Sequence, residues 1–261
     1  MTSDRWLISP RPSPDAAWQL FCFPHAGGGT GTFTAWAGGL WPGIEVTAIC
    51  PPGRERHLAG SAYRDMAPLV AALASVLAQQ VRARYAFFGH SLGALVAFEL
   101  ARVLAHRGAG PAHLFLSASR PPQLLRKEPE LHRLDDDSLL AAMARHGGIP
   151  DDLASMPGML ELVLPALRAD LEILAGYRSP SGDPLTCAIT AMGGDQDSDV
   201  EPDSLLEWRL MTTGAFNRRL LPGGHFYMTA QRHLVLDAIQ RDLAVHDRVP
   251  SIHSCVEAAK P

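Results

Sequence analysis

The sequence predicts an α/β protein with a mostly parallel central sheet and helices on both of its faces. Short apolar runs rich in β-branched and aromatic residues alternate with longer runs that repeat apolar residues at helical spacing. The chain has 261 residues, of which 47% are hydrophobic, so it can bury one full core. We therefore expect a single domain over residues 1–261.

Six strands and four helices are expected from this alternation. The strands are expected at residues 18–23, 45–49, 85–88, 113–117, 187–192 and 217–221. The helices are expected at residues 66–81 and 92–106, with weaker patterns at 204–212 and 228–243.

Residues 120–177, approximately, break the alternation, because they contain two helical patterns and no strand. We expect an α-helical lid inserted over the sheet. Asp135 and the two aspartates after it should cap and begin a helix that runs to Arg145 and stops at Gly147-Gly148. The second helix, at 159–174, is apolar around most of its circumference, and Pro165 is expected to kink or divide it. It is either an ordinary core helix or part of a lid that meets an acyl chain.

Composition excludes several classes of protein. The net charge of −4 gives no basic excess for nucleic acid, and no run approaches the roughly 18 apolar residues of a membrane span. Four scattered cysteines suggest neither disulfides nor a zinc site, and the N-terminus lacks a secretory signal. We expect a reduced, cytoplasmic protein that acts as a monomer, and we treat residues 247–261, approximately, as a tail.

The strongest motif lies at residues 89–93, GHSLG, which match the pattern G-x-S-x-G. It follows one expected strand and opens one expected helix, which is the context of the nucleophile elbow in the α/β-hydrolase fold. A serine at such a tight turn needs small residues two positions before and after it, and Gly89 and Gly93 meet this need. We predict that Ser91 is the nucleophile. The alternative is a glycine-rich turn with an incidental serine.

An acid and a histidine must accompany this serine, because a hydroxyl is a poor nucleophile until an oriented imidazole takes its proton. The order along the chain in this fold is serine, acid, histidine. His225, in the GGHF turn after the last expected strand, is the predicted general base, and His90 is expected to support packing. The GGDQD turn contains two candidate acids. We predict that Asp197 orients His225 and that Asp195 binds turn amides.

Two backbone amides are expected to stabilise the oxyanion of the tetrahedral intermediate. One belongs to Leu92, directly after the nucleophile. The other is assigned to Ala26 in the loop PHAGGG at 24–29, whose glycines allow a close approach of the substrate. A phosphate could also bind such a loop, but neither a G-x-G-x-x-G pattern nor a Walker lysine follows. We predict no cofactor and no metal ion.

Five segments together resemble the type II thioesterases that accompany polyketide and nonribosomal peptide synthases. They are FPHAGG at 23–28, PGRER at 52–56, GHSLG at 89–93, GDQD at 194–197 and GGHF at 223–226. The elbow and the histidine turn occur in many hydrolases, whereas PHAGG and PGRER indicate this family more narrowly. Cys50-Pro51 differs from the leucine-proline expected before PGRER, at no catalytic position.

The resemblance implies a stand-alone enzyme that removes aberrant or stalled acyl groups from the phosphopantetheine arm of acyl or peptidyl carrier protein domains, as in antibiotic biosynthesis. The residues by themselves indicate only a serine acyl hydrolase. Two alternatives therefore stay open. One is a general serine esterase or lipase that acts on soluble esters, and the other is a non-catalytic chaperone that binds carrier proteins.

A carrier partner would be acidic, so basic residues are expected around the entrance to the site. Two local clusters qualify, although an ordinary solvated surface is the alternative. They consist of Arg54, Arg56 and His57 after the second strand, and of Arg120, Arg126, Lys127 and Arg133 at the start of the insertion.

Overall fold

A seven-stranded sheet forms the centre of the computed structural model, which describes residues 5–82, 84–125, 130–145, 147, 157–179 and 182–247. The strands are β1 (Leu7–Ile8), β2 (Trp18–Phe23), β3 (Ile44–Ile49), β4 (Tyr85–His90), β5 (His113–Ser117), β6 (Ala188–Gly194) and β7 (Phe216–Leu221). Their order is β1-β3-β2-β4-β5-β6-β7, and all are parallel except β1. The six expected strands are confirmed. The antiparallel edge strand β1 is too short to show a pattern in the sequence.

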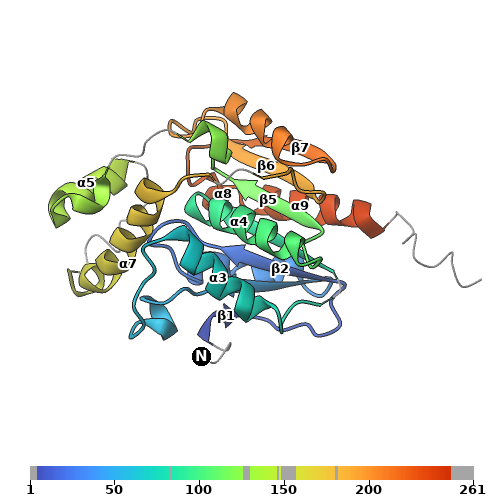
Figure 1. Cartoon of the computed structure of the whole chain (residues 1–261), viewed down its shortest axis with the longest axis horizontal. Coiled ribbons are helices and arrows are strands. Elements are labelled where there is room, and N and C mark those ends of the chain that lie inside the picture. The colour runs from blue at the N-terminus through green and yellow to red at the C-terminus, as the bar shows by residue number, and fades with distance from the viewer. Residues whose placement is uncertain are drawn as a thin grey trace, which may run out of the picture.

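Helices cover both faces of this sheet (Figure 1). One face packs against α3 (Met66–Leu77) and α4 (Leu92–His106), and the other packs mainly against α2 (Trp36–Leu40) and α9 (Arg232–Asp247). Two short helices, α1 (Gly31–Thr34) and α8 (Tyr227–Ala230), complete the second face. Adjacent residues of a strand serve opposite faces, as β4 illustrates: Phe87 belongs to the first core and Phe88 to the second.

The helix expected at 204–212 is a 3-10 helix, η5 (Pro202–Met211). Its two buried side chains, Leu205 and Trp208, are three residues apart. Three residues make one turn of a 3-10 helix, so this spacing places both side chains on the inner side.

The insertion contributes α5 (Asp136–Arg145) and α7 (Pro157–Gly176), which lie together beyond one edge of the main body, at the left of Figure 1. Asp135 begins α5 as expected, since its Oδ1 accepts the Ser138 amide at 2.9 Å. Of the two outcomes expected at Pro165, a kink or a division of the helix, the division does not occur, because α7 is one helix. The proline removes only the hydrogen bond to the Glu161 carbonyl, and Glu161 is exposed, so water can replace that bond.

None of the described helices is both long and apolar enough to span a bilayer. Three described cysteines, Cys22, Cys50 and Cys187, are free thiols. The tail is expected at about 247–261. Asp247 is instead the last residue of α9, and residues 248–261 lie outside the described residues, as does Gly148.

A buried polar network fastens α9 to the sheet. His113 of β5 is within hydrogen-bond distance of His246 (Nδ1 to Nε2, 3.0 Å) and of Thr190 (Nε2 to Oγ1, 2.9 Å). Thr190 donates to the Asp242 carboxylate at 2.8 Å, and Arg219 of β7 pairs with the same carboxylate. The network therefore joins one helix to three neighbouring strands.

This network makes the stability depend on pH. Burial, together with the smaller effects of His246 and Arg219, lowers the pKa of His113 to about 3, against the opposing effect of the Asp242 charge. An unfolded histidine titrates near 6.5, so the unfolded chain takes up the proton first as the pH falls. The contribution of His113 is complete above pH 6.5 and is lost toward pH 3, by up to about 1.4 kcal/mol per pH unit.

We expect His113→Gln to flatten the pH dependence of the unfolding free energy between about pH 6.5 and 4.5, because the substituted side chain does not titrate. Urea unfolding at a series of pH values measures this slope separately from any constant loss of stability. A slope equal to that of the original protein would contradict the assignment.

Candidate active site

Ser91 occupies the tight turn between β4 and α4, with φ 56° and ψ −120°. Such a conformation is strained for a residue with a side chain and is typical of functional sites. A Cβ added to Gly89 would lie 2.2 Å from the Gly93 carbonyl oxygen, and one added to Gly93 would lie 2.2 Å from the Phe23 carbonyl oxygen. Both positions exclude a side chain, as the elbow motif predicts. The Ser91 amide also donates to the Ser117 carbonyl at 2.8 Å.

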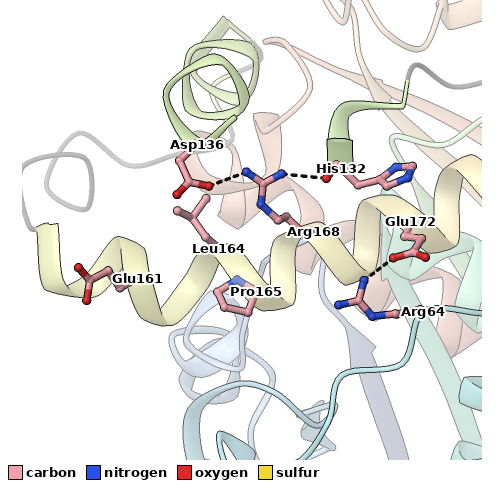
Figure 2. Close-up of a pocket in the computed structure, with 8 residues that line it drawn as sticks. All are labelled: Arg64, His132, Asp136, Glu161, Leu164, Pro165, Arg168 and Glu172. Atoms are coloured by element: carbon pink, nitrogen blue, oxygen red, sulfur yellow. Dashed lines mark hydrogen bonds and ion pairs between the residues drawn. The ribbon is translucent and has the colours of Figure 1, made fainter. Parts of the chain in front are cut away.

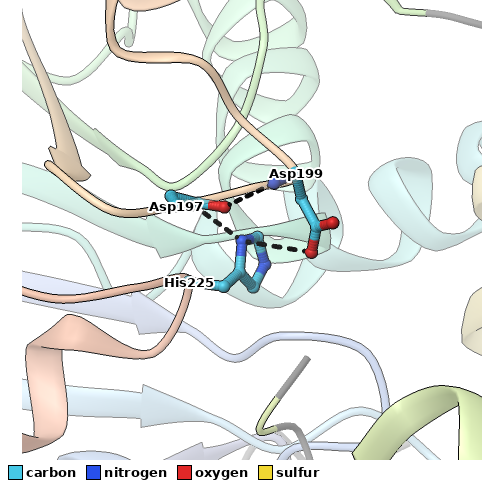
Figure 3. A group of neighbouring side chains, drawn as sticks. All are labelled: Asp197, Asp199 and His225. Atoms are coloured by element: carbon cyan, nitrogen blue, oxygen red, sulfur yellow. Dashed lines mark hydrogen bonds and ion pairs between the residues drawn. The ribbon is translucent and has the colours of Figure 1, made fainter. Parts of the chain in front are cut away.

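His225 and Asp197 come from neighbouring turns, after β7 and β6, and form a direct pair (Figure 3). Nδ1 of His225 lies 2.9 Å from Oδ2 of Asp197. The other carboxylate oxygen accepts the amides of Asp199 and Val200, at 2.9 and 3.1 Å. Burial raises the pKa of Asp197, but the bond and charge of His225 and the two amides outweigh it, so the pKa lies below its usual value. Asp197 is therefore ionised at neutral pH.

The ionised carboxylate determines the tautomer of His225. A carboxylate only accepts hydrogen bonds, so Nδ1 of the neutral imidazole carries the proton and Nε2 is left as the basic nitrogen. The pair of Asp197 and His225 thus has the orientation that a general base requires.

Asp195 has a separate role in the same turn. Its Oδ1 accepts the amide of Gly223 at 3.0 Å, and its own amide donates to the Leu221 carbonyl at 2.9 Å. Asp195 thereby fastens the acid turn to the glycines before His225, as expected from the sequence.

Asp199 is a neighbour of His225 that the sequence analysis missed. Its Oδ2 lies 4.0 Å from Nδ1 of His225, and its side chain is 34% exposed (Figure 3). The segment DQDSD places aspartates at every second position, and only the first two were considered. One ligand atom each of Asp197, Asp199 and His225 lie within 4.8 Å of one another, so a cation could also bind there. The hydrogen bond at Nδ1 instead suits proton transfer by His225.

Two further imidazoles lie beside His225 and stay neutral. His90 is fully buried, with Nδ1 2.9 Å from Oγ of Ser117. Burial lowers the pKa of His90 well below its usual value, and the neighbouring His225 and His25 lower it further. Burial likewise lowers the pKa of His25 to about 4, with smaller effects from His225 and Arg54. A proton gained by His225 therefore meets no second charged imidazole.

One cavity of about 390 Å³ brings the remaining predicted residues together. Ser91, His225, Ala26 and Leu92 all line it, and Asp197 lies behind His225. The insertion supplies five apolar side chains to the same cavity: Leu125, Leu131, Met143, Leu171 and Leu174. The arrangement offers a serine, an oriented imidazole and backbone amides in one cavity with apolar side chains, and these are the groups that acyl transfer requires.

The sequence model of the thioesterase domain matches residues 18–243. This protein belongs to the thioesterase family. The thioesterase PikA5 of Streptomyces venezuelae is 36% identical over 252 residues, which are 95% of this chain and 89% of PikA5. The gramicidin S biosynthesis protein GrsT of Aneurinibacillus migulanus is 32% identical over 92% of this chain and 94% of its own. The structure of the type II thioesterase BorB, from the borrelidin biosynthetic cluster, has a TM-score of 0.87 and 34% identity, over 92% of this chain and 98% of BorB.

These comparisons confirm the resemblance to type II thioesterases and the α/β-hydrolase fold. The thioesterase is thus an enzyme of the serine hydrolase class that acts on thioesters. Membership in this enzyme family argues against the alternative function of a non-catalytic chaperone.

The three aspartates near His225 should differ sharply in a mutational test. Asp197→Asn should reduce kcat for a small acyl thioester by about three to four orders of magnitude, because an amide can hold the wrong tautomer of His225. Oδ2 of Asp199 lies 4.0 Å from Nδ1 of His225, which is beyond hydrogen-bond distance, so we expect Asp199→Asn to cost about tenfold or less. Asp195→Asn is the matched control within the turn. A larger loss in either control than in Asp197→Asn would move the role of the acid to that residue.

Proposed function

We propose that this thioesterase hydrolyses aberrant or stalled acyl groups from the phosphopantetheine arm of carrier protein domains in polyketide or nonribosomal peptide biosynthesis. The observation that carries this proposal is the cavity in which Ser91 and His225 meet the apolar side chains of the insertion. A cavity of about 390 Å³ lined in this way suits an acyl chain better than a polar substrate. The similarity to BorB, a type II thioesterase, supports the same role.

In the proposed mechanism, Oγ of Ser91 attacks the thioester carbonyl while Nε2 of His225 takes its proton. Asp197 stabilises the imidazolium that forms, and the amides of Ala26 and Leu92 donate to the oxyanion. The intermediate collapses, the carbon–sulfur bond breaks, and His225 protonates the departing thiol. Water then attacks the acyl-enzyme with His225 again as base. The products are a carboxylic acid and the free enzyme.

The position of Leu92 supports its proposed role in stabilising the oxyanion. It is the first residue of α4, a helix of 15 residues. The first amides of a helix have no acceptor within the helix, and the helix dipole there favours negative charge. A developing oxyanion near Leu92 would receive both effects.

The proposed carrier-binding surface includes fewer of the basic residues than the sequence suggests. Arg54 and His57 are buried, so the first basic cluster is largely structural. Arg120 pairs with a glutamate at 2.6 Å. Arg126 and Lys127 lie outside the described residues, and their contact with an acidic carrier stays a prediction. The expectation of a monomer also stays a prediction.

Ser91→Ala should reduce hydrolysis of both an acyl-carrier thioester and a small acyl thioester to the background rate, a loss of at least about a thousandfold. The thermal unfolding temperature should change little, because only one hydroxyl is removed. Substantial kcat in this variant would contradict the assignment of the nucleophile.

The substrate class is tested by comparing a thioester with the oxygen ester of the same acyl group. We expect the higher kcat/KM for the thioester, with a further gain when a carrier protein presents it. A higher kcat/KM for the oxygen ester would favour the esterase interpretation instead.

The preference for one acyl group over another should depend on the side chains of α7 that line the cavity beside Ser91. Leu171→Ala enlarges the cavity beside Ser91, so kcat/KM should shift toward longer or bulkier acyl groups across a panel of thioesters. Leu164→Ala is the matched control: both leucines are 8% exposed, but Leu164 lines a separate cavity (Figure 2). Each variant should lose about 2–4 kcal/mol of stability. The same acyl profile in both would show that α7 serves only the core.

A further inference from the structure

A buried ion pair joins α7 to the segment that follows β3. The guanidinium of Arg54 forms two parallel hydrogen bonds with the carboxylate of Asp170, each of 2.8 Å. Each side chain is only 8% exposed. Arg54 belongs to the PGRER segment and Asp170 lies in α7, 116 residues away along the chain.

The pair also makes hydrogen bonds to the loop that contains Ala26. The amide of Gly27 donates to Oδ2 of Asp170 at 2.8 Å, and Arg54 donates to the carbonyl of Gly28 at 2.9 Å. The helix itself rests on this loop, because a Cβ added to Gly27 would lie 3.0 Å from Leu167 of α7. The φ of +72° at Gly27 also requires glycine.

The next residue of the PGRER segment extends the same attachment. Glu55 accepts the amide of Thr30 at 2.8 Å and its hydroxyl at 2.6 Å. A Cβ added to Gly29 would lie 2.1 Å from Oε1 of Glu55. Arg54 and Glu55 thus hold successive parts of the loop from Gly27 to Thr30.

These contacts determine where the Ala26 amide points. Gly28, held by Arg54, donates its own amide to the carbonyl of His25 at 2.9 Å. That carbonyl and the Ala26 amide belong to one planar trans peptide, in which they point in opposite directions. Fixing the His25 carbonyl therefore aims the Ala26 amide away from the loop. Asp170 holds the following peptide, which limits rotation on the other side of Ala26.

We propose that Arg54 and Asp170 are positioning residues that aim the Ala26 amide at the oxyanion and link the oxyanion hole to α7. The inference rests on the proposed function, in which Ala26 donates to the tetrahedral intermediate. Two buried charges are a costly way to obtain stability alone, since apolar side chains of similar size can replace such pairs without loss. The same pair is an effective way to hold two peptide groups in fixed orientations.

The experiment separates position from stability by comparing a broken pair with an apolar pair. Asp170→Asn leaves Arg54 without its counter-charge and should reduce kcat for a small acyl thioester by about ten- to a hundredfold with little change in KM. The double variant Arg54→Met/Asp170→Leu should regain most of the thermal stability but not kcat. Glu172→Gln is the control. Glu172 lies on the same helix as Asp170 and forms an exposed ion pair with Arg64, so its substitution should leave kcat unchanged (Figure 2).

A second readout tests the oxyanion hole itself and does not require the double variant to fold. An acyl trifluoromethyl ketone forms a tetrahedral adduct with the serine, whereas a thioether analogue of the substrate does not. Asp170→Asn should weaken inhibition by the ketone by about the factor lost in kcat, and should leave binding of the thioether nearly unchanged. Equal weakening of both inhibitors, or recovery of kcat together with stability in the double variant, would overturn the inference.

Ser91→Ala, measured with the same thioester, separates this result from the proposed function. Turnover retained in Ser91→Ala would overturn the proposed function and the inference with it. If Ser91→Ala loses turnover while Arg54→Met/Asp170→Leu keeps the kcat of the original protein, the inference alone is overturned and the proposed function stands.

Discussion

Close contact between backbone segments is the constraint on which the whole site depends. Gly93 lies directly on the carbonyl of Phe23, so the elbow touches the start of the loop that leads to Ala26. Gly194 lies in the same way on the carbonyl of Gly223, where a Cβ would come within 2.1 Å. Each contact joins two neighbouring parallel strands, β2 to β4 and β6 to β7. Ser91, the proposed nucleophile, is thereby placed against the proposed oxyanion loop, and Asp197, the proposed acid, against the turn that contains His225.

The sheet explains why these contacts occur at one edge. Parallel strands end at the same side of a sheet, where loops are free to carry functional residues. β5 lies between the two contacts and connects them, since the Ser117 carbonyl accepts the Ser91 amide and the Ala118 amide donates to the Met192 carbonyl of β6. Burial then keeps His25 and His90 neutral, while hydrogen bonds keep Asp197 ionised. The proposed catalytic proton therefore has one suitable acceptor, His225.

The sequence could predict the parts of the site that depend on local patterns. Ser91 and His225 stand in short motifs whose glycines are needed for local steric reasons, and the surrounding strands have clear apolar patterns. The ion pair between Arg54 and Asp170 leaves no such trace. An arginine in a loop resembles a surface residue, and its partner lies 116 positions away in a helix whose pattern indicates only apolar burial. Asp199 was missed for a related reason, because its distance to His225 depends on how two turns meet.

The second insertion helix, α7, contributes side chains both to the main core and to the cavity beside Ser91, so it is not an ordinary core helix alone. Leu167, Leu171 and Ile173 belong to the main core, and Leu171 also lines the cavity beside Ser91, together with Leu174. All four lie after Pro165. The exposed Met159 and Leu162 lie before it.

Asp170 belongs to the half of α7 after Pro165 and holds the amide of Gly27. Any opening of the insertion that displaced this half would also release the oxyanion loop and expose two unpaired charges. The part of α7 before Pro165 contains neither the hydrogen bond to the Gly27 amide nor the buried ion pair with Arg54. Access of an acyl chain to Ser91 is therefore compatible with an intact form of the proposed oxyanion hole only if the half of α7 that contains Asp170 stays in place.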